Sequence, residues 1–253
     1  MTSLRPYLQR TRIAYLSMEI GIRSEMHTYS GGLGALAGDV ARSAADLDLP
    51  MVFVTLASRQ GYLHQEIDAE GRQVDHADPW DPAAWATPLD ATVAIRIEGR
   101  QVWIRPWLYE LTCPLGTKVP VILLDTGTEQ NDLLGRHRRD GGRPETDGAL
   151  YDADPVRAAC VFTTHTPVEA GHDRFDYGEV RRILGDIIEP EELRRLAGED
   201  RLNMTRLALN LSGYVNGVAR RHAETARKLF PGYRVRAVTN GVHMGHWAHP
   251  AFA

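Results

Sequence analysis

A glycine-rich stretch has the residue types to bind an anion or a sugar. Residues 29–39 read Tyr-Ser-Gly-Gly-Leu-Gly-Ala-Leu-Ala-Gly-Asp and follow an apolar run that predicts a buried strand. Glycines at a strand-to-helix junction let a phosphate or a sugar hydroxyl approach the backbone, and the free N–H groups of the helix start face that ligand. Ser30 is the expected N-cap. A tight turn used only for close packing is the alternative, and the motif alone does not decide between the two.

Three histidines near the end of the chain could suggest a metal. His243, His246 and His249 follow one another in steps of three. The segment shows neither a helical pattern nor a carboxylate partner, so we predict that it binds no metal. A Gly-x-Ser-x-Gly elbow is absent from the sequence, which argues against a serine hydrolase.

Composition narrows the class of protein. The 253 residues carry a net charge of −4, which does not favour nucleic-acid binding. No run of 18 apolar residues predicts a membrane span, and no apolar region near the first residues predicts a signal peptide, so we expect a cytoplasmic protein. Cys113 and Cys160 are expected to be buried, reduced thiols. Lys118 and Lys228 are the only lysines, so lysine chemistry has two candidates.

The glycine stretch is expected to lie within a βαβ unit. Residues 12–19 predict a first strand, a helix runs from the glycines to about residue 47, and residues 51–56 predict a second, parallel strand. Ligands of such sheets bind outside the carboxyl ends of the strands. Glu19, Gly31 and Gly32 should therefore lie at one rim.

Residues 59–110 predict antiparallel hairpins inserted at one edge of the parallel sheet. Four tryptophans fall in this region, and core or hairpin packing is favoured for them over a sugar-stacking platform. They are Trp80, Trp85, Trp103 and Trp107.

The remaining elements are expected from pattern alone. Residues 1–11 predict a polar lead-in, residues 119–124 a strand, and residues 127–155 a surface loop with a solvated basic cluster at 136–143. A strand at 160–167 is stopped by Pro167. Two short helices, one long helix and a final strand complete the chain. These are expected at 177–184, at 190–197, from Asp200 or Asn203 to about 230, and at 235–240.

Several motifs, in the same order, resemble those of the α-glucan phosphorylases. The chain is most similar to the shorter bacterial and archaeal glycogen or maltodextrin phosphorylases, over residues 12–250. The motifs are Tyr-Leu-Ser-Met-Glu (15–19), Ser-Gly-Gly-Leu-Gly (30–34), Arg-Gln-Gly-Tyr (59–62), Phe-Thr-Thr-His-Thr-Pro (162–167), Asn-Gly-Val-Ala-Arg-Arg-His-Ala-Glu (216–224) and Val-Thr-Asn-Gly-Val-His (238–243).

The resemblance implies the N-terminal lobe of a two-lobed glycosyltransferase, with a Rossmann-like parallel α/β sheet. It implies transfer of a glucosyl unit from an α-1,4-glucan to phosphate, with pyridoxal phosphate as cofactor. Carried over by position, Gly31, Gly32 and Leu33 would present N–H groups to phosphate, and Glu19 would line the cleft. His165 would hold the glucosyl unit through its ring, with its main-chain carbonyl near the anomeric carbon, and the neighbouring Thr166 would also bind substrate.

The chain departs from that family pattern in two ways. The family's cofactor lysine and phosphate-binding side chains belong to a C-terminal lobe, and neither lysine here matches the cofactor motif. Family members also carry many tens of residues between the segments matching 150–154 and 155–157, so a deletion junction near 154–155 is expected. We therefore expect a truncated lobe over 1–253, with a missing central strand or a sheet closed around the gap. Such a chain is expected to have little or no activity alone.

Two other functions remain open at this point. One is a non-catalytic glucan-binding remnant. The other is the lobe of a starch or glycogen synthase, which has a similar Gly-Gly-Leu-Gly turn but lacks the motifs at 162–167 and 216–220. A C-terminal lobe on another chain or a second copy of this chain is a possible partner; neither nucleic acid nor membrane is expected.

Overall fold

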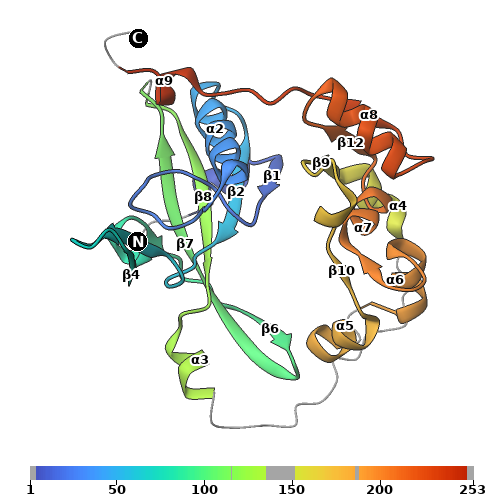
Figure 1. Cartoon of the computed structure of the whole chain (residues 1–253), viewed down its shortest axis with the longest axis horizontal. Helices are drawn as coiled ribbons and strands as arrows, with labels where there is room; N and C mark the ends of the chain where they lie inside the picture. Colours follow the sequence, from blue (N-terminus) through green and yellow to red (C-terminus); the bar gives the residue numbers. More distant parts are fainter. Residues whose placement is uncertain (1–3, 115, 135–151, 186–187, 250–253) are drawn as a thin grey trace. The chain divides into compact units, whose positions relative to one another are not determined.

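The computed structural model describes residues 4–114, 116–134, 152–185 and 188–249, which form two compact units (Figure 1). The first unit holds residues 1–95, 102–137 and 241–253, and the second holds 96–101 and 138–240. Both units contain parallel strands and helices. The architecture is therefore the predicted α/β class, consistent with a Rossmann-like fold, but the parallel strands are divided between two sheets.

The main sheet of the first unit is mixed. Its strand order is β1 (Ile13–Leu16), β2 (Met51–Leu56), β8 (Lys118–Asp125), β7 (Arg100–Thr112) and β5 (Thr87–Pro88), and β6 (Val93–Ile97) also pairs with β7. Strands β1, β2 and β8 are parallel, as the βαβ pattern predicts, and β7 runs antiparallel to β8. The hairpin region predicted at 59–110 is thus confirmed, although β7 joins the main sheet over a longer stretch than expected.

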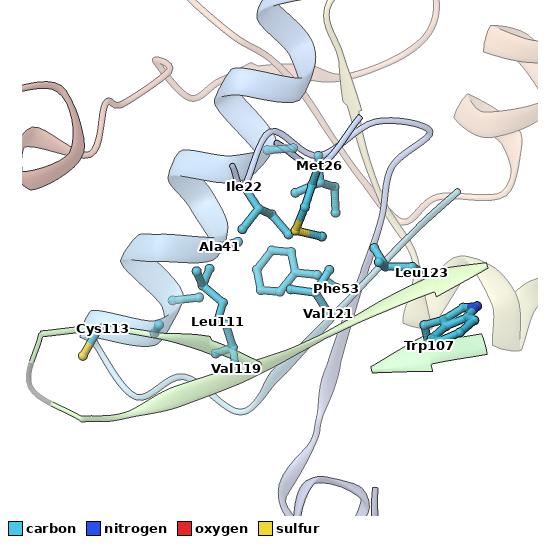
Figure 2. Packing of buried hydrophobic residues seen from close by; sticks show 14 of the residues in the cluster. Ile22, Met26, Ala41, Phe53, Trp107, Leu111, Cys113, Val119, Val121 and Leu123 are labelled. Atoms are coloured by element: carbon cyan, nitrogen blue, oxygen red, sulfur yellow. The ribbon is translucent and has the colours of Figure 1, made fainter. Parts of the chain in front are cut away.

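Helix α2 (Gly32–Asp46) covers this sheet and forms the core of the first unit (Figure 2). Its small residues let the helix approach the strands, and Phe53 of β2 fills the space between them. Residues 20–26, which precede the glycine stretch, add Ile20, Ile22 and Met26 to the same core. This packing fixes the start of α2 at the carboxyl ends of β1 and β2.

The first unit also contains shorter elements. Residues 1–11 are not only a polar lead-in, since α1 (Arg5–Arg10) begins with Pro6 in its first turn, where proline fits a helix. The Tyr7 hydroxyl donates a hydrogen bond to Glu110 of β7. The others are the hairpin β3 (Leu63–Ile67) and β4 (Gln73–Ala77), η1 (Pro82–Ala84), α3 (Glu129–Leu134) and α9 (Met244–Trp247).

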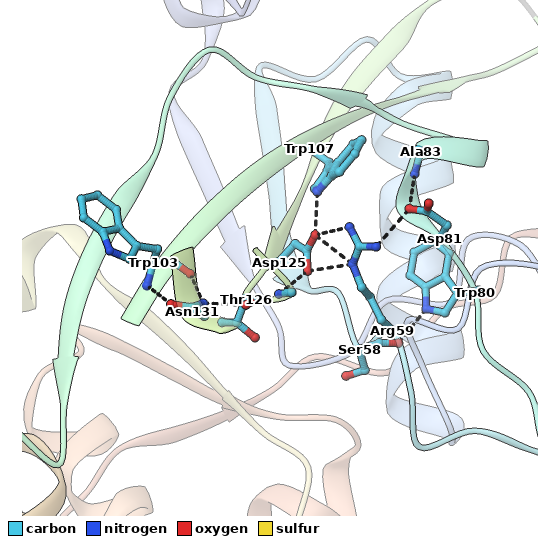
Figure 3. A network of polar contacts seen from close by, with 11 residues as sticks. Ser58, Arg59, Trp80, Asp81, Ala83, Trp103, Trp107, Asp125, Thr126 and Asn131 are labelled. Atoms are coloured by element: carbon cyan, nitrogen blue, oxygen red, sulfur yellow. Dashed lines mark hydrogen bonds and ion pairs between the residues drawn. The ribbon is translucent and has the colours of Figure 1, made fainter. Parts of the chain in front are cut away.

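An ion pair between the partly exposed Arg59 and the buried Asp125 joins the carboxyl ends of β2 and β8 (Figure 3). The Arg59 guanidinium donates to both carboxylate oxygens of Asp125, at 2.8 to 3.2 Å, and the Trp107 indole N–H donates to the same carboxylate at 3.0 Å. Trp107 is buried in the core, and Trp80 packs against it. Packing, which the sequence favours for the four tryptophans, is thus confirmed for Trp107 and Trp80, whereas Trp85 is exposed.

The second unit is built on a three-stranded parallel sheet. Its order is β13 (Val235–Ala237), β12 (Tyr214–Gly217) and β9 (Val161–Thr164). A small core lies between this sheet and α7 and α8, with Val215 and Val235 from the strands. The other elements are α4 (Ala153–Ala159), η2 (Glu169–Gly171), β10 (Arg174–Phe175), α5 (Tyr177–Leu184), α6 (Pro190–Ala197), β11 (Leu202–Asn203), α7 (Met204–Asn210) and α8 (Arg220–Leu229).

The long helix predicted to end near residue 230 is wrong. Two helices and a strand, α7, β12 and α8, replace it. The break follows Leu211, where the N–H of Gly213 bonds to Arg157 and Cys160 carbonyls instead of continuing the helix. The predicted start was sound, because Asn203 caps α7 by accepting from the Arg206 N–H at 2.9 Å.

Three other expectations need correction or stay open. The surface loop predicted at 127–155 contains helix α3 and the start of α4, whereas its basic cluster at 136–143 lies outside the described residues. Cys113 is buried as expected, but Cys160 is exposed because it precedes the edge strand β9. In the described ranges, no helix has the length and apolar character to cross a membrane.

Candidate functional site

The glycine bend, residues 29–34, leads into a helix start that no side chain caps. Helix α2 begins after Gly31, whose extended backbone makes it the N-cap residue, and no side chain caps the helix. The first N–H groups of the helix, from Gly32 to Gly34, have no carbonyl four residues earlier within the helix. Gly31, Gly32 and Leu33 are exposed. The structure thus leaves these backbone donors and the positive end of the helix dipole facing outward.

Ser30 is not the N-cap that the sequence predicts. Its backbone N–H donates to Glu19 Oε2 at 2.8 Å, so the residue belongs to a link between β1 and the bend. Glu19 follows the carboxyl end of β1, which is why its carboxylate reaches the bend. Glu19, one of the expected site residues, therefore lies beside the start of α2 and stabilises the turn there.

Two glycines of the motif serve close packing. A Cβ on Gly38 would lie 1.9 Å from the carbonyl oxygen of Gly21, and one on Gly34 would lie 2.3 Å from the Tyr29 Cβ. The Gly21 N–H donates to the Gly34 carbonyl at 2.7 Å. A Cβ on Gly32 would meet nothing within 4 Å. Both interpretations of the motif therefore apply, to different glycines.

Aromatic side chains lie around Glu19. Tyr62 stacks on His27, with ring centroids 4.8 Å apart. Burial, together with the nearby Glu19 carboxylate and Tyr29, raises the pKa of Tyr62. Tyr62 therefore stays a neutral hydroxyl, which can both donate to and accept from a polar ligand. Sequence reasoning assigned no role to Tyr62, although it ends the Arg-Gln-Gly-Tyr motif.

The other expected residues lie in the second unit. His165 and Thr166 follow the carboxyl end of β9, and both are half-buried. Thr166 packs closely over Gly171, since a Cβ there would lie 2.4 Å from the Thr166 methyl group. Burial lowers the pKa of His165, and the charge of a protonated His222 lowers it further. The structure thus brings Glu19 and the bend together in one unit, and His165 and Thr166 together in the other.

Two further histidines lie in the same unit as His165 and Thr166. His222, in the first turn of α8, and His172, after η2, are both buried. The long helix that the sequence predicts includes His222, and no role was assigned to this residue. A histidine five residues after a strand-ending glycine is the signal that could have identified it.

The triple-histidine segment packs against α2. In the part of the chain that the structure describes, no cluster of three or more metal-ligating side chains is found. His243 instead contacts Asp46 of α2 through its Nε2, at 2.6 Å. Nearby, the Trp247 indole N–H donates to Asp39 at 2.7 Å. These contacts hold the segment against α2.

Neither lysine is placed to hold a cofactor at a strand-end site. Lys118 begins β8, at the edge of the sheet opposite to Asp125, and pairs with Glu110 at 3.4 Å. Lys228 lies in the last turn of α8 and is exposed. A helix that follows a strand starts at the strand's carboxyl end, so its last turn lies away from that rim.

Several known proteins match this chain over most of its length. The chain is 30% identical to maltodextrin phosphorylase of Thermococcus litoralis, a match that covers 94% of this chain and 36% of that protein. It is 29% identical to glycogen phosphorylase of Mycobacterium tuberculosis, over 95% of this chain and 37% of that protein. An uncharacterised protein of Methanocaldococcus jannaschii is 25% identical over 94% of this chain and 54% of its own length. No family model matches the chain.

Fold and site together define an α/β protein with an exposed, uncapped helix start at the carboxyl ends of parallel strands. Within that class, the sequence is similar to those of the glycogen and maltodextrin phosphorylases. It spans about a third to a half of the length of the relatives that it matches, consistent with a partial, N-terminal-lobe-like chain.

The alignment with the Thermococcus protein has more positions than this chain has residues. The match with the Thermococcus protein extends over 308 positions, whereas 94% of 253 residues supplies about 238 of them. About 70 positions of that alignment therefore have no residue of this chain. The relative carries residues that this chain lacks within the matched region.

Proposed function

We propose that this chain carries the phosphate-binding and glucan-binding part of an α-glucan phosphorylase. The family reaction would transfer a glucosyl unit from an α-1,4-glucan to inorganic phosphate and yield glucose 1-phosphate. The observation that carries the proposal is the exposed, uncapped start of α2 at Gly31–Leu33. Backbone N–H groups aimed at an anion stabilise it without side-chain reorganisation.

The two groups of residues would have separate roles. The bend would bind phosphate through the N–H groups of Gly32 and Leu33, with Glu19 fixing its shape through Ser30. His165 and Thr166 would bind hydroxyl groups of the terminal glucosyl unit, the His165 ring as a neutral imidazole that donates one hydrogen bond and accepts another. The His165 carbonyl would stabilise positive charge at the anomeric carbon.

Pyridoxal phosphate is the cofactor that the family implies, and the residues of this chain do not fit it. A covalent link to this cofactor requires a lysine at the site, and Lys118 and Lys228 lie at the other ends of their elements. We therefore propose that this chain does not bind the cofactor covalently. The proposed junction near 154–155, for which the unmatched positions of the alignment are support, would remove a further part of the lobe.

Half of a transition-state site lacks the preorganised groups that the chemistry needs. We therefore expect no glucose 1-phosphate when the purified chain is incubated with maltodextrin, inorganic phosphate and added pyridoxal phosphate. Formation of glucose 1-phosphate would contradict that expectation. Binding of maltoheptaose without turnover would favour the glucan-binding module, and absence of binding would favour a remnant without ligand.

The phosphate half of the proposal is tested by one pair of variants at one position. Gly32→Pro removes the N–H of the first helical residue, and the extended Gly31 before it accommodates a following proline. Gly32→Ala keeps the N–H, and its added Cβ meets nothing within 4 Å. Loss of one charge-assisted hydrogen bond of about 1.5 kcal/mol should weaken inorganic phosphate binding about tenfold in the proline variant alone. Equal affinities in calorimetry would overturn the assignment.

A further inference from the structure

A buried histidine joins three elements of the second unit. His172 follows η2 and is 6% exposed. Its Nδ1 lies 2.8 Å from the Thr205 hydroxyl oxygen in the first turn of α7. Its ring also contacts Phe230 at the end of α8, with centroids 4.9 Å apart and ring planes at 84°. The imidazole therefore connects the chain after β9 to two helices.

The second ring nitrogen of His172 is sealed without a partner. Nε2 is buried, and among the described residues no group forms a hydrogen bond with it. With the proton on Nδ1, donated to Thr205, a neutral ring leaves Nε2 as an acceptor only. Protonation would place an N–H and a positive charge at this sealed position, and a buried charge without a partner is costly. The packed position thus favours the neutral ring over the charged one.

The loop that this histidine ends carries two of the expected site residues. It comprises residues 165–171, from His165 to the glycine before His172. Thr166 packs over Gly171, since a Cβ on that glycine would lie 2.4 Å from the Thr166 methyl group. Contacts that hold His172 on α7 and α8 therefore also hold the end of the loop against Thr166.

We propose that His172 is a pH-dependent anchor, which holds the 165–171 loop against α7 and α8 at neutral pH and releases it in mild acid. The proton comes from solvent and binds at Nε2 once the ring has left its packed position. Because the loop carries His165 and Thr166, the anchor would position both residues toward a glucosyl unit. That last step rests on the proposed function, whereas the anchor does not.

The charges around the ring do not stabilise its protonated form enough to reverse the effect of burial. Burial is the main cause of the lowered pKa of His172, and the charges of Arg174 and, where protonated, His222 lower it further. Glu169 and Asp173 act in the opposite direction, but Glu169 is paired with Arg174 at 2.8 Å. The charged residues next to Thr205 in α7 and near Phe230 in α8 are exposed. They are Arg206, Arg227 and Lys228.

The direction of the pH effect follows from this lowered pKa. A released His172 has the ordinary histidine pKa of about 6.5, and the anchored ring has a lower one. The stability that the anchor contributes is therefore fully present above about pH 6.5, and it is lost as pH falls toward the pKa of the anchored ring.

Hydrogen exchange on the whole chain measures release of the loop. The amides of Gly171 and His172 donate to carbonyls within this segment. Their protection, corrected for intrinsic exchange, should fall by up to about tenfold between pH 7 and pH 5.5. Constant protection over this range in the wild-type chain would overturn the proposal.

Two variants that do not titrate assign the pH effect to His172. His172→Asn keeps a polar group for Thr205, and His172→Phe keeps a flat ring beside Phe230. In either variant, protection of the loop should no longer depend on pH, and one folded variant is enough for the test. The control is His64→Asn, at an exposed position in the β3–β4 hairpin, which should keep the wild-type pH dependence. A pH dependence that persists in the His172 variants would assign it to another group and overturn the proposal.

A third variant tests the contact with α7 at one pH. Thr205→Val removes the hydroxyl group at nearly constant shape and should lower protection of the loop about fivefold at pH 7, the effect of one hydrogen bond. Thr225→Val is the matched control, since that hydroxyl bonds to the Arg221 carbonyl within α8. Unchanged protection in Thr205→Val would contradict an anchor that acts through Nδ1.

Maltoheptaose separates this inference from the proposed function. If the anchored loop binds the glucan, saturating maltoheptaose should raise protection of the loop at pH 7, because a ligand stabilises the state that binds it. A pH-dependent protection that maltoheptaose does not change supports the anchor and contradicts the proposed function. Protection that is independent of pH overturns the anchor even where maltoheptaose binds.

Discussion

The carboxylate of Glu19 accepts a hydrogen bond from the backbone N–H of Ser30, with 2.8 Å between Oε2 and N. This contact joins the end of β1 to the residue before the N-cap of α2. It also places a negative charge beside backbone donors that we propose to bind phosphate. The same side chain therefore shapes the bend and weakens its attraction for an anion.

Replacing Glu19 by glutamine should separate these two effects. The amide oxygen can still accept from Ser30, but the negative charge is removed. At a partly exposed site, one unit charge a few ångströms away is worth about 1 kcal/mol, so inorganic phosphate should bind several-fold more tightly. Calorimetry at low ionic strength measures this. Glu66→Gln, in the exposed strand β3, is the matched control and should leave the affinity unchanged. Weaker phosphate binding in Glu19→Gln would show that the carboxylate itself helps the ligand.

Gly38→Ala should destabilise the first unit. The added Cβ would lie 1.9 Å from the Gly21 carbonyl oxygen, a backbone atom that can move only with the loop before the bend. We expect a loss of about 2–3 kcal/mol or more in the free energy of unfolding, the cost of overpacking a core. Urea denaturation measures it. Gly32→Ala lies in the same helix with free space around its Cβ, and a similar loss there would contradict this account.

Asp125→Asn should lower stability in a pH-dependent way. Burial acts to raise the pKa of Asp125, but the Arg59 guanidinium and the N–H groups of Gly127 and Trp107 outweigh it, so the pKa lies below its ordinary value. Such a carboxyl contributes stability above its unfolded-state pKa of about 3.9, and that contribution is lost as pH falls through the lower folded value. The variant should be about 2–4 kcal/mol less stable at pH 7, because Arg59 loses its partner.

The difference between wild type and Asp125→Asn should shrink as pH falls below about 4. Urea unfolding at neutral and acidic pH measures the trend. Asp75→Asn, at an exposed position in β4, should show neither effect. A difference that stays constant with pH would mean that packing around the side chain, and not its charge, accounts for the loss.

Trp247→Phe should loosen the segment at 241–247 from α2. The variant loses the indole N–H that donates to the buried Asp39 carboxylate, which among the described residues then keeps Arg42 alone, at 3.4 Å. A lost hydrogen bond to a charged, buried group costs about 1.5–3 kcal/mol. Trp85→Phe serves as the control, since Trp85 is exposed and lies under the Arg23 guanidinium. Equal losses in urea unfolding of the two variants would argue against a specific role for the indole N–H.

Sequence patterns predicted the bounds of a helix correctly where the residues that determine those bounds lie within the helix or next to it. Helices at 177–184 and 190–197 were predicted with the observed bounds, because Asp176 caps the first and Pro190 begins the second. The long helix failed for the opposite reason. Its apolar spacing continues through residues 211–219, but tertiary pairing of β12 with β9 and β13 takes those residues into the sheet.

The site residues divide in the same way, into those that local sequence predicts and those that tertiary contacts determine. The bend and Glu19 were predicted because strand, glycines and helix are consecutive in sequence. Ser30 was misassigned since a carboxylate from the preceding strand binds its N–H, which local preference does not reveal. His222 was not assigned because its place over Gly217 depends on packing between α8 and β12, which local sequence does not reveal.

Strand β1 pairs with β2 on one side only in the described part of the chain, and near it Leu16 and Met18 are 76% and 83% exposed. Such an edge offers unused main-chain hydrogen-bonding groups flanked by apolar side chains, which is a template for fibrous self-assembly. Arg12, just before the strand, is the kind of charged flank that slows this process. Concentrated preparations of this chain should therefore be most soluble at low salt and above neutral pH, where copies that carry a net negative charge repel one another.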